Sequence, residues 1–316
     1  MKLTWSSSAQ SEPTLIRFSS PSVTSVASVR CFPFSRLSRT EPVLSLTLPK
    51  MHKYLKVFDI GLQNTFVYRW NFFFRALFGL FPLLGTVFIW GAIFEAKGSD
   101  INNFNRASVV YYFLLVLVLD SLITPGDDEW QVAADIRDGQ MNAFLIKPMN
   151  YLVYRLALFV SNRLLYTLVT LPVLIIIFTA FHTYLVWPSS WATWFLTLIS
   201  VFLAGAIQFL IAYSVALFAF WMLEISTVVF IIYSFEYFLS GHMFPIGFLP
   251  PAMQAVLRFL PFPYELYFPI SIFMGKTRGA ELWEGLLIQS CWVLIIAFGA
   301  NTLWQQGLKK YQAVGG

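Results

Sequence analysis

Residues 191–223 constrain the fold more than any other part of the chain, because this stretch contains no charged side chain. A helix needs about 20 predominantly apolar residues to cross the hydrocarbon core of a bilayer. The whole chain is biased in the same direction, with 58% hydrophobic and only 12% charged residues. Soluble domains carry about 25% charged residues. The sequence therefore predicts an all-α membrane protein.

Apolar runs predict about six transmembrane helices. The first run contains Arg75 and Pro82, the third contains Arg155 and Arg163 in its first half, and a short break at Glu224 separates the fourth from the fifth. Together the fourth and fifth are too long for one crossing, which favours a tight turn between them. The predicted spans are residues 72–94, 109–123, 151–181, 191–223, 225–239 and 285–303.

Six spans place both ends of the chain on one side, and basic residues are commoner on the cytoplasmic side of a membrane. With cytoplasmic termini, the inner segments hold Lys53, Lys56, Arg69, Arg75, Arg137, Lys147, Arg155, Arg163, Lys309 and Lys310. The opposite side then holds Lys97, Arg106, Arg258, Lys276 and Arg278. The first set is twice as large as the second, so the charge distribution predicts cytoplasmic termini.

The first fifty residues differ in composition from the rest, being rich in Ser with interspersed Pro and Arg. They have the composition of an organellar transit peptide, or they precede a true start at Met51, which is the reading we favour. In either case we expect residues 1–50 to be disordered and without function, and residues 51–316 to form the transmembrane domain. Residues 53–71 mix charged and apolar side chains, which predicts an interfacial helix; an N-terminal extension of the first span is the alternative.

The loop between the second and third spans, residues 124–150, is the most charged stretch in the chain. Ile136, Met141, Phe144 and Leu145 recur at roughly helical spacing, which predicts one or two short amphipathic helices. Gly139 should end one helix, and acidic residues 127–129 suit a helix N-terminus. A simple connector would not keep apolar residues at regular intervals, so we interpret the loop as a docking surface.

The loop between the fifth and sixth spans, on the outer side, is apolar yet rich in proline. Proline breaks or kinks helices, so this segment cannot be one regular span. Irregular backbone inside a bilayer is tolerated only where it is buried in protein or lines a cavity. We predict a re-entrant helical hairpin here, with a short helix near residues 254–260.

At these two loops the sequence resembles the membrane subunit of a type 2 ABC transporter, the permease of a bacterial exporter. The resemblance covers residues 51–316, and Asp138 departs from it because Glu is commoner at that position. The cytoplasmic-loop motif is Arg137-Asp138-Gly139-Gln140-Met141 followed by Leu145-Ile146-Lys147-Pro148. The outer-loop motif is Ser240-Gly241, Phe244-Pro245, Leu249-Pro250 and Pro261-Phe262-Pro263.

The resemblance implies a mechanism and a set of partners. Two permeases, typically two different ones in the most similar subgroup, would form the pathway in a bacterial inner membrane. Separate ATPase subunits would dock on the cytoplasmic loop, at Arg137, Asp138, Gly139, Met141, Leu145, Lys147 and Pro148. The chain would then need no cofactor, since its partner binds ATP. Gly275-Lys276-Thr277 resembles the end of a phosphate loop, but position 270 is Ile where that motif requires Gly.

A carboxylate within the fifth span, Glu236, is costly in a bilayer and should face protein or water. It either contributes to the pathway or is a structural carboxyl bonded to Tyr233 or His242. Arg155 and Arg163 suit interfacial anchors better than substrate contacts. Asp120 would cap the second span or pair with one of these arginines.

Two other classes of protein compete with the exporter interpretation. A secondary transporter would usually show internal repeats or several midspan ionisable residues, and an integral membrane enzyme would need a catalytic constellation at one membrane face. The scattered histidines and the two distant cysteines predict neither a catalytic nor a metal site.

Overall fold

The computed structural model describes residues 50–67, 69–97, 104–124 and 126–311, and all regular elements within them are helical. The prediction that residues 1–50 are disordered concerns residues outside the described part of the chain, apart from Lys50, where α1 begins. In chain order the elements are α1 (Lys50–Val67), α2 (Arg69–Phe78), α3 (Leu80–Lys97), α4 (Arg106–Ile123), α5 (Asp128–Arg137), α6 (Met141–Leu145), α7 (Tyr151–Ala180), η1 (His182–Tyr184), α8 (Trp191–Ala216), η2 (Leu217–Phe220), α9 (Ser226–Leu239), η3 (Ile246–Phe248), α10 (Pro251–Leu257), η4 (Phe262–Tyr264), α11 (Tyr267–Phe273) and α12 (Ala280–Lys310).

Helices suited to a membrane dominate the described chain. Four helical segments are long and apolar enough to cross a bilayer, and they contain α4, α7, α8 and α12. Two shorter apolar helices, Leu84–Ala96 and Ser226–Leu239, lie in the predicted first and fifth spans. An all-helical membrane protein is therefore confirmed, while the number of six crossings stays a prediction.

The predicted first span, residues 72–94, is not one helix but is divided between α2 and α3 at Gly79. The Gly79 N–H donates to Arg75 O at 2.9 Å and closes the last turn of α2. Pro82 then lies in the first turn of α3, where its missing N–H costs no helical hydrogen bond. Glycine followed closely by proline is a usual way to end one helix and begin another.

The predicted turn between the fourth and fifth spans is confirmed. The chain leaves α8 through the short η2, and α9 begins at Ser226. The Ser226 N–H donates to Glu224 Oε1 at 3.1 Å, so the carboxylate satisfies a backbone donor that the start of a helix leaves free.

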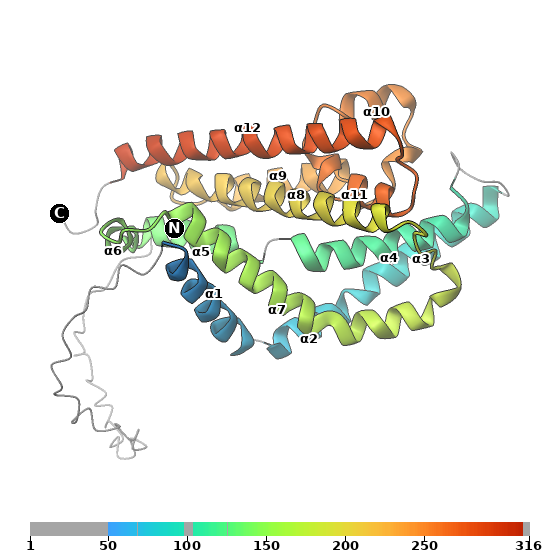
Figure 1. The fold of residues 1–316 in the computed structure, drawn as a ribbon, viewed down its shortest axis with the longest axis horizontal. Helices are drawn as coiled ribbons and strands as arrows, with labels where there is room; N and C mark the ends of the chain where they lie inside the picture. Colours follow the sequence, from blue (N-terminus) through green and yellow to red (C-terminus); the bar gives the residue numbers. More distant parts are fainter. Residues whose placement is uncertain (1–49, 68, 98–103, 125, 312–316) are drawn as a thin grey trace, which may run out of the picture. The chain divides into compact units, whose positions relative to one another are not determined.

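Two apolar clusters hold the helices together. One joins α5, α8 and α12 with the start of α7, and the other joins α4 with the end of α7 and residues of α11. Along the bundle α12 packs on α8, while α1 and α2 pack on α7 (Figure 1). This order leaves α4 between α3 and α7.

Helices α7 and α12 are longer than one crossing requires. At 1.5 Å per residue, their 30 and 31 residues extend about 45 Å, against about 30 Å of hydrocarbon core. The start of α7 lies beside the end of α12, where the rings of Tyr151 and Trp304 stack with centroids 5.1 Å apart. We call this end of the bundle, where α6 also lies, the α6 end (Figure 1).

Candidate coupling and pathway site

The loop after α4 forms two short helices, as the sequence predicts, and we call residues 128–148 the coupling segment. Its helix α5 begins with Asp128 and Glu129 in the first turn, where acidic side chains favour the helix dipole. Gly139 follows α5 with φ of +72°, a left-handed conformation that glycine adopts without steric cost. Helix α6 follows, and the Asn150 side chain accepts from the Val153 N–H at 3.2 Å to start α7.

Three of the four residues of the apolar stripe face inward and Leu145 is exposed, which corrects part of the docking prediction. Ile136 and Met141 are 4% and 0% exposed and belong to the cluster shared with α8 and α12. Phe144 packs its ring 4.8 Å from that of Tyr151 and 4.9 Å from that of Tyr154. These residues hold the segment against the bundle, because helices this short are stable only when they bury apolar area. Met141 is therefore part of the apolar core and is not exposed for contact with a partner.

The outward surface is formed by Leu145 and the residues that follow it. Leu145 is 48% exposed and Ile146 is 85% exposed. Arg137, Asp138, Lys147 and Pro148 of the same segment are also exposed. Exposed apolar residues in company with charged ones are typical of a protein-binding patch. Ile146 belongs to the predicted loop motif but not to the predicted docking residues, because the periodicity of a short helix does not identify its outward side.

A single buried arginine joins α5 to α7. Arg155 is 6% exposed and forms an ion pair with Asp135. Its Nε donates to Tyr151 Oη at 2.9 Å, and its Nη1 and Nη2 donate to the side chain and backbone of Gln131, each at 3.1 Å. The interpretation of Arg155 as an interfacial anchor is wrong, since the side chain points into the protein and has its donors satisfied there.

The end of α5 also contacts the turn before α9. Arg137 Nη1 donates to Leu223 O at 3.1 Å. In the same turn, hydrogen bonds from the backbone and hydroxyl of Ser226, and to a smaller degree the Arg137 guanidinium, hold the pKa of Glu224 below its ordinary value. The coupling segment is thus connected to α7 through Arg155 and to the start of α9 through Arg137.

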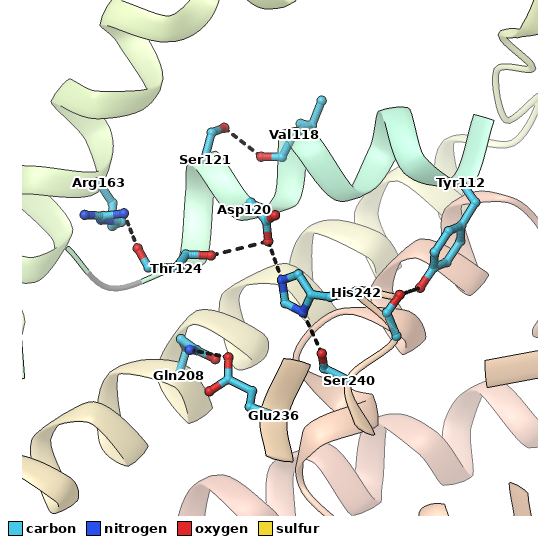
Figure 2. A network of polar contacts seen from close by, with 11 residues as sticks. Tyr112, Val118, Asp120, Ser121, Thr124, Arg163, Gln208, Glu236, Ser240 and His242 are labelled. Atoms are coloured by element: carbon cyan, nitrogen blue, oxygen red, sulfur yellow. Dashed lines mark hydrogen bonds and ion pairs between the residues drawn. The ribbon is translucent and has the colours of Figure 1, made fainter. Parts of the chain in front are cut away.

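The junction between α4 and α5 is stabilised by Arg163, which is likewise not a free anchor. Its Nη1 donates to Thr124 O, one residue beyond the end of α4 (Figure 2). Its Nε is buried without a hydrogen-bond partner among the described residues. Arg163 therefore satisfies backbone that the break between the helices leaves unpaired.

Asp120 pairs with a histidine from the far part of the chain and not with Arg155 or Arg163, which corrects the prediction. His242 Nε2 lies 2.8 Å from Asp120 Oδ1, and its Nδ1 lies 2.6 Å from Ser240 Oγ (Figure 2). Thr124 donates to the same Asp120 oxygen at 3.3 Å. A pairing across 122 positions leaves no local signal in the sequence.

Glu236 is buried within α9, and Gln208 of α8 donates to its Oε1 at 2.8 Å (Figure 2). The structural alternative predicted a bond to Tyr233 or His242, whereas the hydrogen bond comes from Gln208. The Glu236 Oε2 has no hydrogen-bond partner in the described part of the chain, and neither does either oxygen of Glu265, which is 1% exposed. The two carboxyl groups interact electrostatically. Buried carboxyls of this kind mark functional sites in membrane proteins more often than elsewhere.

The outer loop is broken into short pieces, as its prolines predict. Gly241 has φ of +102°, and Tyr112 donates to its carbonyl at 2.7 Å. Gln254 of α10 donates to Leu249 O at 2.7 Å, and Tyr267 N–H donates to Ser240 O at 3.1 Å. The segment that we call the outer hairpin contains Gly241, Phe244, Pro245, Leu249, Pro250, Pro261 and Pro263.

The residues of these sites are suited to binding a partner and to transmitting movement between helices. Among the described residues no group of three or more His, Cys, Asp and Glu side chains is placed to hold a metal ion. Lys276 of the Gly-Lys-Thr sequence lies over the Phe104 ring, 3.2 Å from its centroid. The site consists of an exposed surface around Leu145 and Ile146 at the α6 end, and of polar side chains such as Asp120 and Glu236 within the helices.

Long apolar helices, several of them long enough to cross a bilayer, define an all-helical integral membrane protein. The family model described as ABC-2 family transporter protein matches residues 80–315. The chain therefore belongs to the ABC-2 family of transporter proteins, which confirms the resemblance. Such permeases are the membrane component of a transporter and generally work with an ATPase subunit. No curated protein matches the sequence.

Proposed function

We propose that this chain is the permease subunit of an ATP-driven exporter, with a substrate pathway formed together with a second permease. The chain itself binds no nucleotide or cofactor, and separate ATPase subunits dock on the coupling segment. The permease resides in a bacterial inner membrane with the α6 end and both termini in the cytoplasm. Pairing with a different permease fits the subgroup that the motifs resemble most closely.

The observation that carries the proposal is the exposed centre of the coupling segment. Ile146, at 85% exposed, and Leu145 lie at the α6 end of the bundle, in the same segment as the charged side chains Arg137, Asp138 and Lys147. Large apolar side chains placed together in a charged, water-facing segment favour a protein partner. Burying such a residue contributes about 1.5–3 kcal/mol.

The packing beneath this surface supports transmission of movement into the spans. Met141 and Ile136 fix α6 and α5 to α8, while Arg155 fixes α5 to α7. A force on Ile146 therefore moves a rigid unit, since packed interiors are not continuously deformable. The Arg137 contact with Leu223 extends the route to the start of α9, which carries Glu236. Glu236 then contributes a polar contact to the pathway.

The test is co-purification of the chain with the ATPase encoded beside it. Ile146→Asp should weaken the association by at least tenfold, because a carboxylate replaces an apolar contact at the centre of the patch. Ile146→Val is the conservative variant and should retain most binding. Val256→Asp is a matched control, since Val256 is 65% exposed on α10 at the outer hairpin.

Equal ATPase recovery with Ile146→Asp, Val256→Asp and the unmodified chain would refute docking on the coupling segment. ATP-independent transport by the purified chain would instead favour a secondary transporter. Cross-linking through single cysteines on α9 between differently tagged copies separates a homodimer from a pair of different permeases.

A further inference from the structure

We propose that the protein binds an anionic amphiphile between α2, α4 and α7, with its headgroup at Arg75 and Arg163 and its chain along α4 and α7. The site is independent of the ATPase-docking surface and of the direction of transport. Three sets of observations support it: the shape of two joined cavities, the charge at their junction, and the apolar lining of one of them.

Two cavities share part of their lining. One, of about 440 Å³, lies between α2, α3, α4 and α7, and the other, of about 930 Å³, lies between α1, α2, α5 and α7. Arg75, Arg163 and Tyr166 line both of them. Sites for small molecules are typically about 300–1,000 Å³, so each cavity is large enough for part of an amphiphile.

The junction brings two guanidinium groups together. Arg75 is exposed, and no ion pair with it occurs among the described residues. It repels Arg163 electrostatically, while Asp128 attracts Arg163. Arg163 retains a buried Nε without a hydrogen-bond partner in this part of the chain. An anionic group between the two arginines would offset this repulsion, as phosphates do at paired arginines.

Acidic groups near the junction already have partners. Asp128 accepts from the Gly126 N–H at 3.2 Å and lies near Arg163. Asp120 lines the smaller cavity but contacts His242 and Thr124. The larger cavity is lined by Asp135, which is paired with Arg155, and by Asp127, which attracts Arg163 electrostatically, while Lys147 adds a further cation. The positive groups that remain favour an anion.

The rest of the smaller cavity favours a hydrocarbon chain. Its wall includes Val116 and Leu117 of α4 and Val173, Leu174 and Ile177 of α7. On the same part of α7, Leu168 and Ile176 are 65% and 67% exposed, a surface suited to acyl chains. A free phosphate would gain nothing from this wall, whereas burying each CH₂ of a lipid contributes about 0.8 kcal/mol. These residues therefore favour a lipid over a small anion.

Native mass spectrometry of the full-length protein, co-purified with its partners and exposed to equal phosphatidylglycerol and phosphatidylcholine, tests the site without ATP. The unmodified chain should retain phosphatidylglycerol preferentially. Arg75→Gln should lower that preference about tenfold, the effect of losing one charge-assisted hydrogen bond. Arg75→Lys should preserve most of the preference. Arg258→Gln, at an exposed arginine near the outer hairpin, should change nothing.

Leu174→Trp should reduce retention of both lipids by filling the apolar part of the cavity. An excess of glycerol phosphate, which has the charged group without the chain, should leave phosphatidylglycerol bound. Displacement by glycerol phosphate would overturn the proposal in favour of a small-anion site. An unchanged lipid preference in Arg75→Gln would overturn it outright, and since Arg75 is exposed this variant should fold normally.

Discussion

Replacing Arg155 with leucine tests whether one buried side chain fixes the coupling segment to α7. The change removes the ion pair to Asp135 and the hydrogen bonds to Tyr151 and Gln131. Removing one partner of a buried pair costs about 3–5 kcal/mol, because the remaining charge is left uncompensated. The Asp135 side chain is 23% exposed, so water compensates part of the loss. We expect Arg155→Leu to lower the free energy of unfolding by about 2–4 kcal/mol.

A double-mutant cycle isolates the pair from the packing of the long side chain. Asp135→Leu and the double variant are unfolded in mixed micelles beside Arg155→Leu and the unmodified protein. The double variant should be less destabilised than the sum of the single variants, with a coupling energy of about 2 kcal/mol. If the two single effects add to within about 0.5 kcal/mol, the ion pair between Arg155 and Asp135 does not stabilise the protein, and the reasoning is refuted. In complexes with the ATPase, Arg155→Leu and Asp135→Leu should reduce the stimulation of ATP hydrolysis more than they reduce binding of the ATPase.

Three further perturbations test other contacts. Arg137→Ala removes the hydrogen bond to Leu223 O, and purified complexes should keep their ATPase but show reduced substrate-stimulated ATP hydrolysis; unchanged stimulation contradicts the route to α9. Gly241→Ala should destabilise the protein by about 1–3 kcal/mol in thermal unfolding, since φ is +102° and an added Cβ would lie 2.5 Å from Tyr112 Oη; a neutral result contradicts this packing. The depressed pKa of Glu224 means that its contribution to stability is present above its ordinary value of 4.5 and is lost as pH falls through the folded-state pKa. Glu224→Gln should therefore flatten the acid limb of the stability profile, and an unchanged limb would show that the cap contributes nothing.

Local signals in the sequence determined the class of protein and the positions of its helices. Runs of about 20 apolar residues require helices in lipid, since backbone groups must be paired within the segment. Proline and glycine correctly indicated the broken outer loop, and Gly139 correctly indicated the end of α5. The loop motifs were sufficient to indicate the family, which the match over residues 80–315 confirms.

Contacts between distant segments were decided only by the tertiary structure. Asp120 meets His242, Gln208 meets Glu236 and Arg155 meets Asp135 because segments distant in the sequence pack side by side, and no pattern within one helix encodes such a pairing. The same holds for the coupling segment. Its periodicity predicted an amphipathic surface, but only packing against α8 showed that Met141 faces inward and Ile146 outward. Sequence periodicity shows that a helix has an apolar and a polar face, and the neighbouring helices determine which residues are buried.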